Sequence, residues 1–70
     1  MVYPENAALY QERYERCRQR AIAAGALKPK GMGERMAAGV LASNGQSWEN
    51  TAKAQARLAA WIEQCMSQPD

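Results

Sequence analysis

The chain has 70 residues, a net charge of +2 and no histidine, so it fits one small domain and lacks the commonest general base of enzymes. Its two cysteines, Cys17 and Cys65, form no CxxC pair, which argues against a zinc site within one chain. The N-terminal residues resemble no signal peptide, and no stretch approaches the roughly 18 apolar residues of a membrane span. We therefore expect a cytoplasmic protein that does not bind membranes. We interpret both cysteines as small, buried and reduced, with one intramolecular disulfide as the alternative.

The first predicted helix covers residues 5–24, begins after Pro4 and ends before Gly25. Along it, apolar residues recur at alternating intervals of 4 and 3, which is the pattern of a helix-packing seam. We expect this seam to face inward while the arginines of the helix face solvent. The seam consists of Tyr3, Ala7, Tyr10, Tyr14, Cys17, Ala21 and Ala24.

A linker with Pro29, Gly31 and Gly33 precedes the second predicted helix, which covers residues 32–42. Its large apolar residues recur every four positions and should share one face. They are Met32, Met36 and Val40. The sequence Ser-Asn-Gly at residues 43–45 predicts the end of this helix.

The third predicted helix covers residues 47–66, with Ser47 as its N-cap and five alanines that raise its helix propensity. Glu49 and Lys53 are spaced for an ion pair within this helix. One face of the helix is expected to be buried. That face contains Thr51, Ala54, Leu58, Trp61, Ile62 and Cys65.

The fold class predicted from these elements is all-α, because no segment alternates between apolar and polar residues with period two. Residues 1–70 should form a single domain, either a helical hairpin or a small three-helix bundle with long, short and long helices. Large aliphatic residues are few. We therefore expect a homodimer in which two thin cores merge.

Catalytic chemistry has little support in the sequence. The serines lie at predicted helix boundaries, where capping accounts for them. Glu12 and Glu15 share the charged side of a helix, where surface ion pairs are the ordinary interpretation. The GMG triplet at residues 31–33 lacks the spacing of a P-loop. We expect a non-enzymatic protein without cofactor or metal.

The most informative charged group is an arginine strip on the first helix, formed by residues at i, i+4, i+7 and i+11. Three interpretations compete: a solvated face, a surface for an acidic protein, or a nucleic-acid contact. Two lysines extend the positive charge into the linker. The predicted contact residues are Leu9, Arg13, Arg16 and Arg20 of the arginine strip, with Lys28 and Lys30 beside them.

We favour protein binding: a small helical inhibitor, adaptor or regulator, of the kind found in phage or mobile elements, that binds an acidic surface of another protein. The alternative is a dimeric nucleic-acid-binding transcriptional regulator. Residues 33–58 contain helix, turn and helix, but Gly39 lies inside the first of these helices and not in the turn. The base or phosphate contacts would come from Asn50, Lys53 and Arg57.

Overall fold

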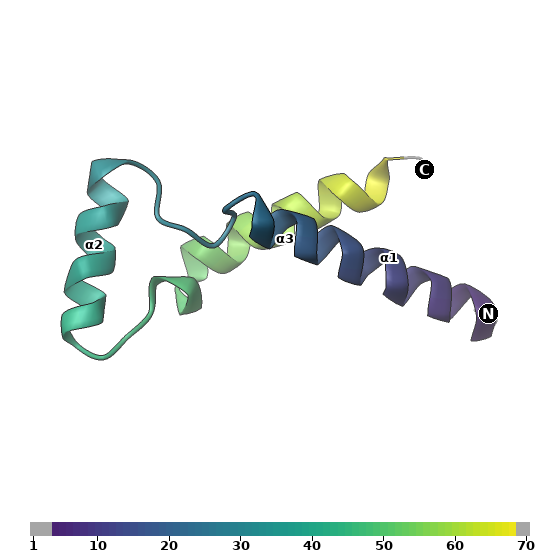
Figure 1. The fold of residues 1–70 in the computed structure, drawn as a ribbon, viewed down its shortest axis with the longest axis horizontal. Coiled ribbons are helices and arrows are strands. Elements are labelled where there is room, and N and C mark those ends of the chain that lie inside the picture. The colour runs from purple at the N-terminus through teal and green to yellow at the C-terminus, as the bar shows by residue number, and fades with distance from the viewer. Residues whose placement is uncertain (1–3, 69–70) are drawn as a thin grey trace.

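The computed structural model describes residues 4–68, and this part of the chain contains three α-helices, one short 3-10 helix and no strand. The all-helical fold with three helices is confirmed (Figure 1). The observed bounds of α1 and α2 lie within one residue of those expected from the sequence. In chain order the elements are α1 (Pro4–Ala23), α2 (Gly31–Ser43), η1 (Trp48–Asn50) and α3 (Ala52–Ser67).

The expected third helix is divided into two elements. Ser47 caps only the 3-10 helix η1, by accepting a hydrogen bond from the Glu49 N–H. Thr51 has an extended backbone and is the N-cap of α3, where its Oγ1 accepts from the Ala54 N–H at 3.2 Å. Glu49 therefore lies outside α3. The predicted Glu49–Lys53 ion pair is wrong, because Lys53 instead lies 3.4 Å from a carboxylate oxygen of Glu34.

Two glycines end their helices in the left-handed region. Gly25 (φ 90°) follows α1, and Gly45 (φ 74°) follows α2. After α1, the N–H of Ala26 donates to the carbonyl of Ala21, and the N–H of Gly25 donates to the carbonyl of Ile22. This is the Schellman arrangement, and it turns Ala26 back into the core.

The core lies where α1 and α3 cross. Ala21 and Ala26 are fully buried there against Leu58 and Ile62 of α3. Small alanine side chains let the two helix backbones approach closely. The crossing explains why the core is thin, since only a short part of each helix contacts the other.

A disulfide joins the two helices at this crossing. Cys17 of α1 and Cys65 of α3 are bonded, with their Cα atoms 5.7 Å apart. The interpretation of two reduced cysteines is therefore wrong, and the alternative of one intramolecular disulfide is the one observed. Burial of Cys17 in the core was expected and is found.

Only part of the predicted seam is buried. Beyond the disulfide α1 diverges from α3, so Tyr10 is 61% exposed and Tyr14 is 39% exposed. The expectation that both tyrosines face inward is wrong, because the helices cross instead of running side by side. Ala7 and Ala24 are also exposed, and Tyr3 lies outside the described residues.

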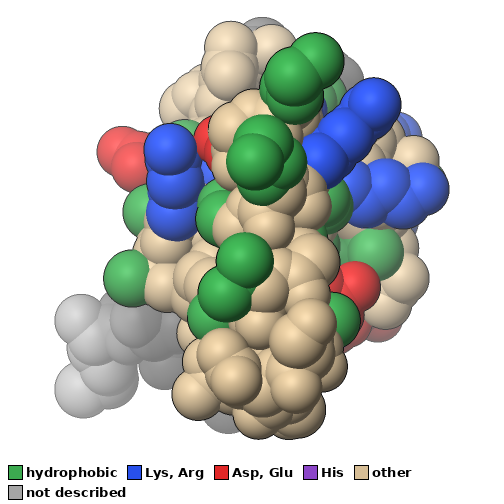
Figure 2. All heavy atoms as spheres, turned by 90° about the vertical axis from the view of Figure 1, so that its left-hand side faces the viewer, with side chains coloured by type: hydrophobic (Ala, Val, Ile, Leu, Met, Phe, Trp, Pro, Cys, Tyr) green, Lys and Arg blue, Asp and Glu red, His purple; other side chains and the backbone are tan. Residues whose placement is uncertain are grey.

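Helix α2 stands apart from the α1–α3 crossing and packs on η1 (Figure 1). Trp48 of η1 is buried. Glu34 of α2 reaches α3, where its carboxylate accepts a hydrogen bond from Arg57 at 2.8 Å. Figure 2 shows the opposite side of α2, where hydrophobic side chains form a line along the helix.

The molecule is long for its size. Its extents are 47 × 22 × 17 Å, and its radius of gyration is 15.2 Å. A compact domain of this length has a radius of gyration of about 11 Å. The two ends of the molecule are formed by α2 and by the N-terminal part of α1.

Candidate protein-binding surface

The diverging ends of α1 and α3 enclose an open groove, which we call the fork groove. Tyr10 and Tyr14 form its α1 side. Ile62 is buried at its base, and Met66 is half-buried beside it. The α3 side consists of Ala59, Ile62, Glu63, Met66 and Ser67. Two exposed aromatic rings therefore face an apolar wall that carries one carboxylate.

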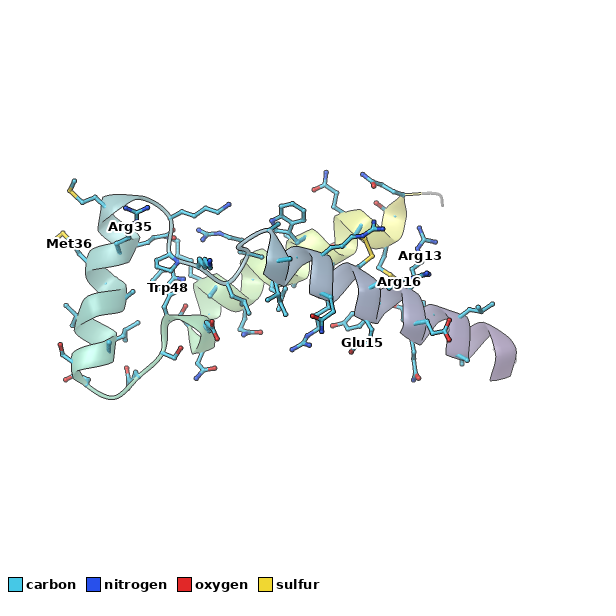
Figure 3. The ribbon with its side chains drawn as sticks, viewed as in Figure 1. Arg13, Glu15, Arg16, Arg35, Met36 and Trp48 are labelled. Atoms are coloured by element: carbon cyan, nitrogen blue, oxygen red, sulfur yellow. A yellow bond between two sulfur atoms is a disulfide. The ribbon has the colours of Figure 1, made fainter. Side chains whose placement is uncertain are left out.

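Of the arginine strip, Arg13 is the residue that reaches across to the α3 side of the fork groove. Leu9, Arg16 and Arg20 are exposed, as expected from the sequence. Arg13 is half-buried and donates a hydrogen bond to the carbonyl of Gln68 just after α3. In Figure 3, Arg13 points toward the C-terminal end of α3, whereas Glu15 points away from it. Arg13 thus ties the two sides of the fork groove together.

The two lysines predicted beside the strip lie elsewhere. The carbonyl of Lys28 accepts a hydrogen bond from Arg57 Nη1 at 3.2 Å, and the N–H of Lys30 donates to Glu34 at 2.8 Å. Both residues therefore lie beside α2 and the start of α3, away from Leu9. The structure does not gather all six predicted residues into one patch.

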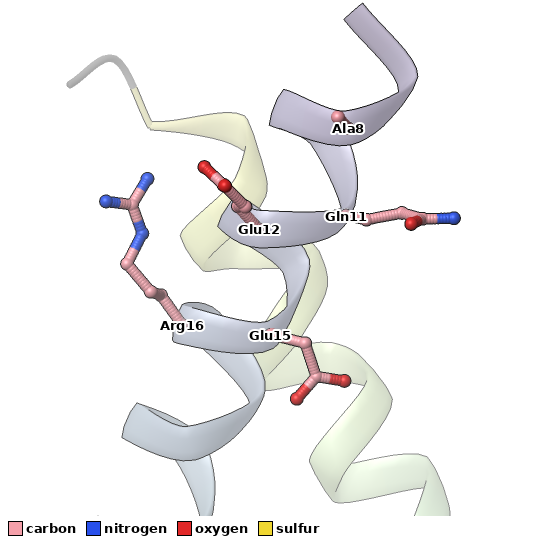
Figure 4. A pocket seen from close by; sticks show the side chains of 5 residues that line it. All are labelled: Ala8, Gln11, Glu12, Glu15 and Arg16. Atoms are coloured by element: carbon pink, nitrogen blue, oxygen red, sulfur yellow. The ribbon is translucent and has the colours of Figure 1, made fainter. Parts of the chain in front are cut away.

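The outer side of α1 carries a shallow hollow (Figure 4). All of its lining residues come from α1 alone, so it is an open helix surface and not an enclosed cavity. Glu12 and Glu15 are both exposed there. The lining residues are Ala8, Gln11, Glu12, Glu15 and Arg16.

The residues considered for nucleic-acid binding are differently placed. Asn50 is exposed in η1. Arg57 is half-buried and Lys53 is exposed, and both interact with the carboxylate of Glu34. The hydrogen bond from Arg57, with those from Lys30 and Lys53, lowers the pKa of Glu34 to about 2. The hydrogen bond with Glu34 in turn raises the pKa of Arg57.

Glu34 is the residue that the sequence analysis missed. Its position in the first turn of α2 was the available signal, because a carboxylate there accepts from free N–H groups and complements the helix dipole. Its partners on α3 are 19 and 23 positions away, so no local pattern points to them.

Metal sites and membrane-spanning helices were also sought within residues 4–68. No group of three His, Cys, Asp or Glu residues there is placed to hold a metal ion. None of the described helices is long and apolar enough to cross a membrane.

No protein-family model matches the chain, and no curated protein or solved structure is significantly similar to it.

Proposed function

We propose that this chain is a non-enzymatic helical protein that binds another protein through the fork groove and the exposed part of the arginine strip, and thereby inhibits or recruits it. One observation carries the proposal. Leu9, Tyr10 and Tyr14 are all exposed within about two turns of α1. Tyr10 and Tyr14 line the same groove, and exposed apolar groups that gather in this way mark interaction surfaces in water-soluble domains.

The charge beside the groove favours an acidic partner. Residues 13–20 of α1 contain four arginines and one glutamate. Arg16 and Arg20 are exposed, and arginine forms strong two-pronged hydrogen bonds with carboxylates. Tyrosine and arginine are also the residue types enriched where a few side chains dominate binding energy. The tyrosines would supply buried apolar contact, and the arginines would pair with carboxylates at its edge.

The disulfide supports this function by holding the base of the groove. Cys17 and Cys65 join α1 and α3 where the helices begin to diverge. A groove with a fixed base loses less conformational freedom when a ligand enters it, which favours binding. Because disulfides persist in oxidising environments, we propose an oxidising compartment in preference to the cytoplasm expected from the sequence.

Nucleic-acid binding through α3 has less support. The interaction of Arg57 and Lys53 with Glu34 offsets their charge, and a phosphate would have to compete with that carboxylate. Because the arginines of the strip would bind phosphate as well as carboxylate, the experiment must separate a protein partner from a nucleic acid.

The test is affinity capture from the source cell with the oxidised chain as bait, with and without nuclease. We expect one acidic protein, captured in both conditions. The double variant Arg16→Glu/Arg20→Glu and the variant Tyr10→Ala should each lose it. Arg35→Glu is the control: it reverses the charge of an arginine on α2, and this variant should still capture the acidic protein. The proposal is contradicted if nuclease releases the captured material. It is also contradicted if the double arginine variant and Tyr10→Ala both still capture the protein.

A further inference from the structure

Besides the fork groove, the molecule has another exposed apolar surface, on the side of α2 that faces away from η1. Met32 is 79% exposed, Met36 is 68% exposed and Val40 is 63% exposed. The inner side of α2, which contains Ala38 and Leu41, is half-buried. Figure 2 shows the outer hydrophobic groups in a line along the helix, with basic side chains on both sides of its upper half.

Gly39 belongs to the same outer surface. A glycine inside a helix lowers helix stability relative to alanine, so its presence calls for a reason. A Cβ built on Gly39 would meet nothing within 4 Å, so packing within the chain does not require glycine there. A second helix lying close against this position would require it, because only glycine lets another backbone or a large side chain come so near.

The large and small residues of this surface are arranged in order. Met32, Met36, Gly39 and Ser43 follow one another at intervals of 4, 3 and 4, which is the spacing of a helix-packing seam. Of these four residues the first two are large and the last two are small, and the exposed Val40 lies beside them. Ser43 donates its hydroxyl to the carbonyl of Gly39 at 3.1 Å, so this hydroxyl already has an acceptor within the helix. We call these four residues the α2 seam.

We propose that the α2 seam binds the α2 seam of a second copy of this chain, with the two helices antiparallel about a two-fold axis. This arrangement places Met36 against Gly39 of the second copy, and Met32 against Ser43 of the second copy. Each large side chain then fills the space above a small one. A parallel pair would place methionine against methionine and leave a gap beside the small residues, which close packing disfavours.

The chain as a whole exposes more surface than a compact protein of its mass. The chain exposes 5502 Å². A compact folded protein of 7.7 kDa exposes about 4,300 Å², so this chain has an excess of about 1,200 Å². A stable interface of standard size buries about 800 Å² on each partner. Because a single helix pair lies at the small end of that range, dissociation should be visible at micromolar concentrations.

Charge also distinguishes a second copy from an acidic partner. Helix α2 carries only two charged residues, Glu34 and Arg35, and Glu34 is already paired with Arg57 and Lys53. Arg35 and Met36 both project from the first half of α2 (Figure 3). Two copies would bring two Arg35 side chains near each other, so added salt should strengthen the pair. Salt would weaken binding to an acidic protein.

The test is sedimentation velocity of the oxidised full chain from about 10 to about 500 µM, a range suited to a small interface. We expect a monomer–dimer equilibrium that shifts toward dimer as salt rises. Met36→Glu should be monomeric throughout. Ala37→Glu, off the seam on the same helix, should keep the dimer. Gly39→Ala should raise the midpoint of thermal unfolding at dilute concentration and raise the dimer dissociation constant about tenfold or more.

Gly39→Ala is expected to stabilise the monomer and to weaken the dimer, and these opposite effects distinguish a role in the interface from a general effect on folding. If Met36→Glu does not fold, Gly39→Ala alone still tests the proposal. A monomer at all concentrations, or an unchanged dimer in Gly39→Ala, would overturn the proposal. A dimer lost in Tyr10→Ala but kept in Met36→Glu would also overturn it, by placing the contact at the fork groove. Because the α2 seam does not include the fork groove, failure here leaves the proposed function intact.

Discussion

Glu34 of α2 accepts a hydrogen bond from Arg57 of α3 at 2.8 Å across 23 positions of sequence. Its other carboxylate oxygen accepts from the N–H of Lys30. One side chain thus holds the start of α2 and joins it to α3. With Trp48 beneath the helix, this contact determines where α2 lies and therefore where its outer side points.

Acid should release α2 from α3. The pKa of Glu34 is lowered from 4.5 to about 2 by its hydrogen bonds. A lowered pKa in the folded state means that the carboxylate stabilises the fold above pH 4.5, and that this contribution is lost as the pH falls from 4.5 toward about 2. The protection factors of the α2 amides, which correct each exchange rate for its intrinsic value at the same pH, should therefore fall as the pH is lowered over this range.

Glu34→Gln should remove this pH dependence and give faster exchange of α2 already at neutral pH. Glu49→Gln, an exposed residue of η1, is the matched control and should behave like the unmodified chain. The assignment fails if Glu34→Gln and the unmodified chain show the same acid transition in α2.

Trp48 should be the second support of α2. It is buried, whereas Trp61 of α3 is 42% exposed, so the chain offers one buried and one exposed tryptophan for comparison. Trp48→Ala should cost about 3 kcal/mol locally, because it removes a large buried side chain and leaves a cavity. Hydrogen exchange should show α2 opening while α1 and α3 stay protected.

Trp61→Ala should cost much less and leave the exchange of α2 unchanged. Equal loss of protection throughout the chain in Trp48→Ala would show that α2 is not a separate unit. It would then fold together with the α1–α3 crossing.

Local features of this fold could be predicted from the sequence, and long-range ones could not. Gly25 and Gly45 end their helices because glycine adopts a positive φ readily, and this property is visible in the sequence. The division at Thr51 was missed because Ser47 is an equally suitable N-cap when composition alone is considered.

The candidate site depends on the angle between two helices, which the sequence pattern does not contain. The seam spacing is the same at Tyr10 as at Cys17, yet one residue is exposed and the other is buried. Only the crossing of α1 and α3 separates them. The pairing of Cys17 with Cys65 across 48 positions has the same origin. Exposure of Leu9 and Arg16 was predictable because it depends on the helix period alone.

The disulfide should supply a large share of the stability. Closing a loop of 48 residues stabilises a fold by about 4 kcal/mol in the chain-entropy model. A domain of 70 residues is stable by only about 4–10 kcal/mol in total. Reduction should therefore lower the midpoint of urea unfolding strongly, and the double variant Cys17→Ser/Cys65→Ser should behave like the reduced chain.

Reductant should not affect that double variant further, which controls for effects of the reagent. Thiol labelling under denaturing conditions provides a direct check: no cysteine should react before reduction, and both should react after it. Two reactive thiols in the chain isolated without reductant would contradict the bonded pair.

Ala21 should tolerate no larger side chain, because it is fully buried where α1 meets α3. Leucine at this position would push the helices apart beside the disulfide, and overpacking of this kind costs about 1–3 kcal/mol. Ala23→Leu is the matched control, since Ala23 lies two positions further along the same helix and is exposed. Urea unfolding of the oxidised chain should show a clear loss of stability for Ala21→Leu and almost none for Ala23→Leu. If the two variants were equally stable, the close approach of α1 and α3 at Ala21 would be wrong, and with it the angle that opens the fork groove.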